Sequence, residues 1–329
     1  MKIIAEAAMN HFGSVPLLWT NTEVALNAGA DYVKFQLIRD ETLYAPGEYE
    51  YGTYNIDDVR WLRHHSRIPH EQYKLIAERA ANKAGYRCVT STPFDLTSLE
   101  ELVETQPPFI KIASGDNNYN DLLDEAGKSG FPIIISTGMS TIEQIDQSME
   151  RLLRHTSDIV LMHCVAEYPH DLSNAMLGSI PWLKERYGVT IGFSDHSDGY
   201  AAAVLAASMG CEWFEKHFSL SPANGGLDAK HSVDGKALAE YCKMVRSTPA
   251  ALSGVRSEPS AAELYTAKRA RRGLYYKYSL SKGHIISEDD IVYLRPEKDF
   301  PLEALDIVIG QKLLSDVAEG TPITKTDLS

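Results

Sequence analysis

The sequence has few cysteines and lacks long apolar runs. Its four cysteines form no CxxC pair, and we expect them to be reduced and mostly buried. No apolar stretch approaches the roughly 20 residues of a membrane span. The first residues, MKIIAEAAMNHFGS, are interrupted early by Glu6, Asn10 and His11 and carry no convincing cleavage pattern. These absences predict a cytoplasmic protein without a signal peptide, membrane helix or disulfide framework.

An excess of positive charge is also missing. The chain has 32 basic and 45 acidic residues, a formal net charge of −13. This balance argues against nucleic acid or an anionic membrane as the main partner. An anionic small molecule would need a local basic pocket, so lysines near predicted strand ends are of special interest.

What the sequence does contain is a regular alternation of short apolar runs and longer helical patterns. Glycines separate many of the helical patterns from the next run, as helix C-terminal glycines do. Alternating β and α segments favour a parallel sheet, and eight runs favour a closed (β/α)8 TIM barrel. A doubly wound sheet is the structural alternative. The eight runs span residues 2–6, 31–36, 87–92, 109–114, 132–136, 158–163, 189–194 and 212–217.

The pattern changes after the eighth run. A helical stretch over 237–250 leads into a segment rich in Ser, Pro and Ala, which is typical of a linker. The remaining residues predict short strands and turns. We therefore expect a barrel domain over 1–252, a linker over 253–267 and a small β-rich domain over 268–329.

Polar residues follow nearly every predicted strand, where the active sites of such barrels lie. Lys34 and Lys111 stand inside apolar runs, and a buried ammonium without an anionic partner is costly. A phosphate or carboxylate would satisfy both. Ser114, Ser136 and Ser194, each near a predicted helix start, add hydroxyl and backbone N–H donors suited to phosphate oxygens. Each residue alone also has a structural explanation, as a helix cap or a solvent-reaching lysine.

Two histidines follow adjacent strands. His196 and His217 end the seventh and eighth predicted strands, and with the nearby carboxylate of Asp228 they are a candidate site for a divalent cation with open positions. Two hydrogen-bonded core histidines are the alternative.

The order of motifs resembles the sialic acid synthase family, whose members join phosphoenolpyruvate to an aldose. The resemblance covers essentially the whole chain and implies a TIM barrel followed by a SAF (antifreeze-like) domain. The matching segments are IAEAAMNHFGS, AGADYVKFQ, STPFD, KIASGD, ISTGMST, HCVAEYP, GFSDHSDGYAAA, FEKHF, LRPEKDF and VIGQKL.

Several residue roles are implied by this resemblance alone. His196 and His217 match the family's metal ligands, with Mn²⁺ as the expected ion and Mg²⁺ or Co²⁺ as alternatives. Arg295 matches an arginine that reaches the partner subunit's site, which implies a domain-swapped homodimer. Residues on positions lining the phosphoenolpyruvate site are Lys34, Thr92, Lys111, Ser114, Ser136 and Ser194, and those near the sugar are Glu6, Gln36, Tyr168 and Asp228.

The sequence departs from the family pattern mainly where the sugar is expected. Asp116 replaces the usual glutamate, and Ala166 stands where a polar residue is common. The glycine-rich loop after the Arg-Pro pair is replaced by residues 297–299, and residues 226–229 lack the frequent GPDH pattern. These departures concern the identity of the aldose more than the reaction.

The resemblance implies a carbon–carbon bond-forming transferase of carbohydrate biosynthesis. Its substrates would be phosphoenolpyruvate and an open-chain aldose similar to N-acetylmannosamine, and its products a nonulosonic acid and phosphate. We expect Lys111 and one of the carboxyls Glu6 and Asp116 to act in catalysis, without an assignment between the two carboxyls. The alternatives are the same chemistry on another aldose, giving pseudaminic, legionaminic or shorter-chain acids, or a weakly active sugar-binding paralogue.

Overall fold

The computed structural model describes residues 1–51, 54–221, 223, 226 and 228–329. These residues form two compact units, Met1–Ser253 and Gly254–Ser329. The helices among the described residues include none that is both long and apolar enough to cross a membrane.

The first unit is built on eight parallel strands in the order β5-β2-β1-β10-β9-β8-β7-β6. The edge strands β5 and β6 contact each other, and Thr90 Oγ1 donates to Phe109 O across this contact at 2.6 Å. The sheet is therefore closed, so the predicted TIM barrel is confirmed and the doubly wound alternative is wrong. The strands are β1 (Lys2–Ala8), β2 (Tyr32–Leu37), β5 (Val89–Pro93), β6 (Ile110–Ile112), β7 (Ile133–Ser136), β8 (Ile159–Cys164), β9 (Thr190–Asp195) and β10 (Trp213–His217).

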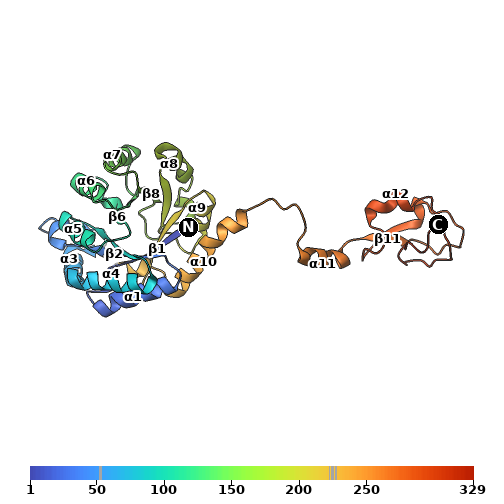
Figure 1. Ribbon diagram of the computed structural model, residues 1–329, viewed down its shortest axis with the longest axis horizontal. Coiled ribbons are helices and arrows are strands. Elements are labelled where there is room, and N and C mark those ends of the chain that lie inside the picture. Colours follow the sequence, from blue (N-terminus) through green and yellow to red (C-terminus); the bar gives the residue numbers. More distant parts are fainter. Residues whose placement is uncertain (52–53, 222, 224–225, 227) are drawn as a thin grey trace. The chain divides into compact units, whose positions relative to one another are not determined.

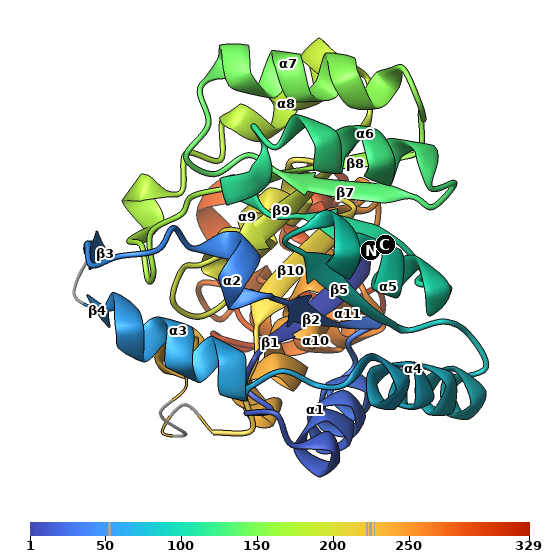
Figure 2. The same ribbon diagram turned by 90° about the vertical axis from the view of Figure 1, so that its left-hand side faces the viewer.

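Helices surround this barrel on its outside (Figures 1 and 2). Their ends follow local chemistry: Gly85 and Gly188 adopt the positive φ that ends α4 and α8, and Thr141 forms a capping box with Gln144 at the start of α7. The helices that follow the strands are α1 (Val15–Asn27), α4 (His70–Ala84), α5 (Leu96–Glu104), α6 (Asn120–Lys128), α7 (Ile142–Leu153), α8 (Ser179–Tyr187), α9 (Ala201–Ser208) and α10 (Gly235–Leu252).

An additional excursion lies between β2 and α4, where no helix or strand was expected from the sequence. It carries two short helices and a small antiparallel pair near one end of the barrel (Figure 2). Its elements are α2 (Asp40–Leu43), β3 (Glu50–Tyr51), β4 (Tyr54–Asn55) and α3 (Ile56–His65).

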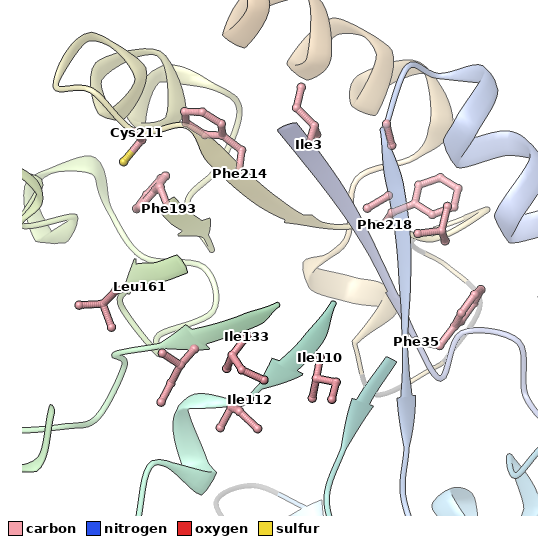
Figure 3. Packing of buried hydrophobic residues seen from close by; sticks show 14 of the residues in the cluster. Ile3, Phe35, Ile110, Ile112, Ile133, Leu161, Phe193, Cys211, Phe214 and Phe218 are labelled. Carbon is pink, nitrogen blue, oxygen red and sulfur yellow. The ribbon is translucent and has the colours of Figure 1, made fainter. Parts of the chain in front are cut away.

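The barrel has two apolar layers. The larger one lies between strands and helices, and Figure 3 shows part of it, with Ile112, Leu161 and Phe214 directed away from the barrel's centre. The smaller one fills the interior near the amino ends of the strands, where the Tyr32 and Trp213 rings stack with centroids 5.4 Å apart. It also contains Ile4, Phe109, Ile134, Val160 and Met162.

The second unit is small and has its own core around Leu274, Tyr276 and Ile323. β11 (Gly273–Tyr276) and β12 (Ile291–Leu294) pair antiparallel. The segment that the sequence predicts as a linker contains most of a helix, α11 (Ala261–Ala270), whose start is fixed by a capping box between Ser260 and Glu263. A four-residue helix, α12 (Leu305–Val308), completes the unit.

Candidate active site

The inward-facing residues change from apolar to polar halfway along the barrel. We call the smaller apolar layer, near the amino ends of the strands, the apolar floor. Because side chains alternate between the two faces of a strand, the residue two positions beyond each residue of this floor faces the interior again. On β1 and β2 this step leads from Ile4 to Glu6 and from Tyr32 to Lys34. On β7 and β10 it leads from Ile134 to Ser136 and from Trp213 to Glu215. The apolar floor thus supports a buried polar layer at the carboxyl ends of the strands.

One side of this layer is an ion-pair cluster around Lys34. Its Nζ lies 2.6 Å from Glu6 Oε2 and 3.8 Å from Glu215 Oε1, and donates to Thr92 Oγ1 at 3.0 Å. Gln36 Nε2 donates to Glu6 Oε1 at 3.1 Å. The sequence led us to expect a ligand anion for Lys34, but the protein itself supplies that anion from β1 and β10.

The two carboxyls of this cluster differ in their acidity. Burial raises the pKa of Glu6 to about 7, since Lys34 only partly offsets the desolvation and the neighbouring Glu215 adds to it. Burial also disfavours ionised Glu215, but Lys111 and Lys34 together outweigh this and lower its pKa to about 2. Glu215 is thus a fixed anion, whereas Glu6 exchanges a proton near neutral pH.

The other side of the layer contains Lys111 on β6. Its Nζ donates to Ser136 Oγ at 2.6 Å and to Ile112 O at 3.2 Å. Among the described residues no carboxylate lies within 4.0 Å of it, and burial lowers its pKa. Lys111 is therefore a buried cation without a directly paired anion.

Two hydroxyls and a backbone N–H lie beside Lys111. Ser114 Oγ accepts from Gly138 N at 3.0 Å, next to Ser136. A Cβ on Gly138 would lie 2.9 Å from Ser114 Oγ and 3.3 Å from Cys164 Sγ, so even a methyl group at this position would be too close to these side chains. This cradle of an ammonium group and two hydroxyls suits a phosphate group.

The two histidines lie close together at the barrel mouth. The ring centroids of His196 and His217 are 5.5 Å apart. The Tyr168 ring stacks on His196 at 3.9 Å and meets His217 edge-on at 5.6 Å. Ser194 Oγ lies 3.4 Å from both His196 Nε2 and Glu215 Oε1, and so connects the imidazoles to the carboxylate side.

Both imidazoles suit a cation. Burial lowers the pKa of each to about 3, so both are neutral. His196 Nδ1 lies 2.7 Å from Val165 O; because a carbonyl only accepts, the proton is on Nδ1 and the Nε2 lone pair is available. His217 Nδ1 is buried and has no hydrogen-bond partner among the described residues. Two uncharged nitrogen donors beside a carboxylate-rich cluster fit a divalent cation.

Two further carboxyls are near this layer. Asp116 lies in a single turn after β6, and burial raises its pKa to about 6. Burial also raises the pKa of Asp228, and Arg63 is the strongest of the cationic groups that oppose this. Arg63 Nη1 lies 3.4 Å from Gln36 Oε1.

Two of these residues, Glu215 and Arg63, were not among our candidate site residues. Glu215 shares the inward face of β10 with His217, two positions away, and that spacing is a signal the sequence carries. Arg63 is on α3, which the sequence analysis did not predict. Arg295 was predicted for the site but belongs to the second unit, where it is exposed after β12.

A second group of potential metal ligands lies away from the histidine pair. Within the described part of the chain, only Asp40, Glu41 and His64 place three potential ligand atoms within 4.8 Å of one another. Arg67 pairs with Asp40 at 3.0 Å and with Glu41, so these charges are already compensated. We interpret this group as a network of ion pairs at the surface.

Comparisons with known proteins place the chain in a family. The model of the NeuB family matches residues 22–257 and that of the SAF domain matches residues 271–329. Pseudaminic acid synthase of Campylobacter jejuni is 29% identical over 331 residues, covering 99% of this chain and 96% of that protein. N,N'-diacetyllegionaminic acid synthase of Legionella pneumophila is 28% identical, covering 98% and 92%.

A solved structure shows the same fold. The crystal structure of N-acetylneuraminic acid synthetase from Leptospira borgpetersenii, in complex with citrate, aligns with a TM-score of 0.70 at 30% identity. The alignment covers 80% of this chain and 89% of that one.

Proposed function

The chain belongs to the NeuB family, and we propose that it condenses phosphoenolpyruvate with an open-chain aldose to give a nonulosonic acid and phosphate. The similar proteins are named as synthases of pseudaminic, legionaminic and N-acetylneuraminic acid. Their names support a carbon–carbon bond-forming enzyme and leave the aldose open among N-acetylmannosamine-like sugars. We place the reaction in the cytoplasm, as expected for a step of carbohydrate biosynthesis.

The observation that carries this proposal is the unpaired Lys111 beside Ser114 and Ser136. A buried ammonium that lacks a carboxylate partner gains most from a strong anion. We assign the phosphate of phosphoenolpyruvate to this cradle, with Ser194 and the Lys34–Thr92 pair further along the polar layer. Held there, the substrate's methylene carbon would face the aldehyde, which supplies orientation.

His196 and His217 are the residues that would hold the metal, and Mn²⁺ is the ion we expect, with Mg²⁺ or Co²⁺ as alternatives. A bound divalent cation would polarise the aldose carbonyl. The remaining work belongs to the protein's own groups. We assign Tyr168, Gln36 and Asp228 to the sugar, because their hydroxyl, amide and carboxyl groups suit sugar hydroxyls.

The methylene carbon of phosphoenolpyruvate bonds to the aldehyde carbon, water adds to the enol ether carbon, and the bond from that carbon to the bridging oxygen breaks, which releases phosphate. One proton leaves the attacking water and one goes to the new alkoxide. The remaining hydroxyl proton is lost as the ketone forms, and the departing phosphate takes it up. Glu6 and Asp116, with pKa values of about 7 and about 6, are the groups suited to move these protons near neutral pH.

We further propose a domain-swapped homodimer in which Arg295 of one subunit completes the sugar site of the other. Two inactive variants, Arg295→Ala and His217→Ala, should regain activity when refolded together, because one site of the heterodimer would receive both defects and the other neither. Heterodimers that form without any recovery would contradict the swap.

The function itself is tested by phosphate release from the purified full chain. Release should require phosphoenolpyruvate, a divalent cation and an aldose together, and should stop in excess chelator. Release that is independent of the aldose would identify a phosphatase instead. Full activity in chelator would overturn the metal assignment.

A further inference from the structure

A buried ion pair lies on the outer face of the barrel wall, directly behind the two histidines. The parallel pairing of β9 and β10 ends with the pair Asp195–Lys216. His217 still pairs with Glu6 of β1, but His196 and His217 lie one residue beyond the last pair of the β9–β10 ladder. The β9–β10 ladder itself therefore does not set the register of these two imidazoles relative to each other.

The Lys216 side chain supplies such a connection. It points away from the interior, because it alternates with Glu215 and His217. Its Nζ lies 3.4 Å from Asp195 Oδ2 and donates to Ser197 O. Lys216 on β10 thus bonds to the residues on both sides of His196.

Asp195 closes the same segment from the other end. Its Oδ1 accepts from Ser197 N at 2.9 Å and from Ser197 Oγ at 2.7 Å. The chain around His196 is therefore fixed twice, once by Asp195 within its own loop and once by Lys216 from the neighbouring strand.

This pair is out of reach of any substrate. The side chains of Lys216 and Asp195 are 3% and 0% exposed. Tyr241 of α10, itself buried, covers them, with its ring centroid 5.7 Å from Lys216 Nζ. A buried ion pair gives little net stability compared with apolar side chains of similar size. Its position between two candidate ligand loops therefore points to a geometric role.

We propose that Lys216 and Asp195 are positioning residues that set the separation and orientation of His196 and His217 for the metal. The inference rests on the proposed metal site. Outer residues that orient metal ligands typically change metal affinity roughly 10- to 100-fold when they are replaced, although they never touch the ion.

The test is Mn²⁺ binding by the full chain, followed by electron paramagnetic resonance of free Mn²⁺, together with thermal unfolding without metal. The double variant Asp195→Asn/Lys216→Met removes both charges with little change of shape, so it avoids leaving one buried charge unpaired. We expect its Kd for Mn²⁺ to rise roughly 10- to 100-fold while its Tm stays close to that of the wild type.

Two controls separate the possible outcomes. Asp124→Asn/Arg151→Met removes another ion pair, which joins α6 and α7 at 2.5 Å, and should leave the Kd unchanged. His217→Ala should abolish binding. If the wild type binds Mn²⁺, His217→Ala does not, and the Asp195/Lys216 variant binds within twofold of the wild type, the positioning role is wrong. If the wild type fails to bind, or His217→Ala binds equally well, the metal assignment falls and the inference with it.

If the double variant loses its fold, Lys216→Met and Asp195→Asn are measured singly. A Kd unchanged in both folded single variants would overturn the proposal just as clearly.

Discussion

The two sides of the barrel mouth treat a buried lysine in opposite ways. On β1, β2 and β10, Lys34 is compensated by Glu6 and Glu215 within the protein. On β6 and β7, the direct partners of Lys111 in the described part of the chain are a hydroxyl and a carbonyl oxygen. The first side is nearly neutral before any ligand arrives, whereas the second holds an unpaired charge. The difference shows where an anion is expected and where protons are exchanged.

The negative net charge of the chain gives the difference between the two lysines a consequence for binding an anionic substrate. A protein with a formal charge of −13 repels anions in general. We therefore propose that Lys111, which is 3% exposed, provides the local positive field that an anionic substrate needs.

The largest effect is expected from removing one imidazole of the histidine pair, which joins the Lys34 side and the Lys111 side of the barrel mouth. His217→Ala should abolish turnover, since it deletes a candidate metal ligand at the mouth and leaves the apolar floor intact. Its Tm should stay within a few degrees of the wild type. His155→Ala, which alters an outer histidine paired with Asp124, is the matched control and should retain activity. Normal turnover by His217→Ala would remove the imidazole pair from the mechanism.

On the Lys34 side of the barrel mouth, replacing Glu215 and replacing Glu6 should lower the free energy of unfolding by different amounts. Glu215→Gln should cost about 3–5 kcal/mol of unfolding free energy at pH 7, as does removing one partner of a buried ion pair. Glu6→Gln should cost less, because the raised pKa of Glu6, about 7, already leaves this carboxyl partly protonated there. Chemical denaturation measures both values. Equal costs would mean that the two carboxyls share the charge of Lys34 evenly.

The uncompensated side should respond in binding rather than in stability. Lys111→Met should weaken phosphoenolpyruvate binding by about 2–5 kcal/mol, or at least about 30-fold in Kd, and change the Tm of the free protein little. Lys34→Met should do the reverse, because it leaves Glu6 and Glu215 without their cation. Calorimetric titration and thermal unfolding of both variants separate the two roles. Equal changes of Kd and Tm in the two variants would contradict the proposed difference between the two lysines.

The smallest expected effect is the pH dependence of stability at Asp116. Burial raises its pKa from 3.8 to about 6, so the native state favours the protonated form. The wild type should therefore lose stability relative to Asp116→Asn as the pH rises from about 4 to about 6, with a constant difference above that range. Tm values measured for both proteins between pH 4 and 8 give this difference. If the wild type instead lost stability relative to Asp116→Asn as the pH fell, the pKa of Asp116 would be lowered in the native state and not raised.

The sequence predicted the barrel well because its strands are continuous apolar runs with regular spacing. The proximity of the histidine pair and the lysines could also be predicted from the sequence, since strand ends meet at one mouth in this architecture. The charge compensation of Lys34 could not be predicted. It depends on strand register, which brings Glu6 of β1 level with Lys34 of β2 and with His217 of β10.

Other features were missed for a different reason. The segment between β2 and α4 has no regular apolar period over its polar residues, so α3 and its Arg63 gave no helical signal. Asp195 and Lys216 were not singled out from the sequence. Alternation places these residues outside the barrel while the histidines point inside. Only the packing of α10 shows that this outer face is buried.

The most direct test of the proposed reaction is mass spectrometry of its products. The full chain would receive Mn²⁺, a panel of aldoses and phosphoenolpyruvate labelled with ¹⁸O at its bridging oxygen. We predict a product whose mass equals the aldose plus pyruvic acid, formed with one equivalent of phosphate that retains the label, because the carbon–oxygen bond breaks. Unlabelled phosphate with free pyruvate, and no condensed product from any aldose, would contradict the assignment.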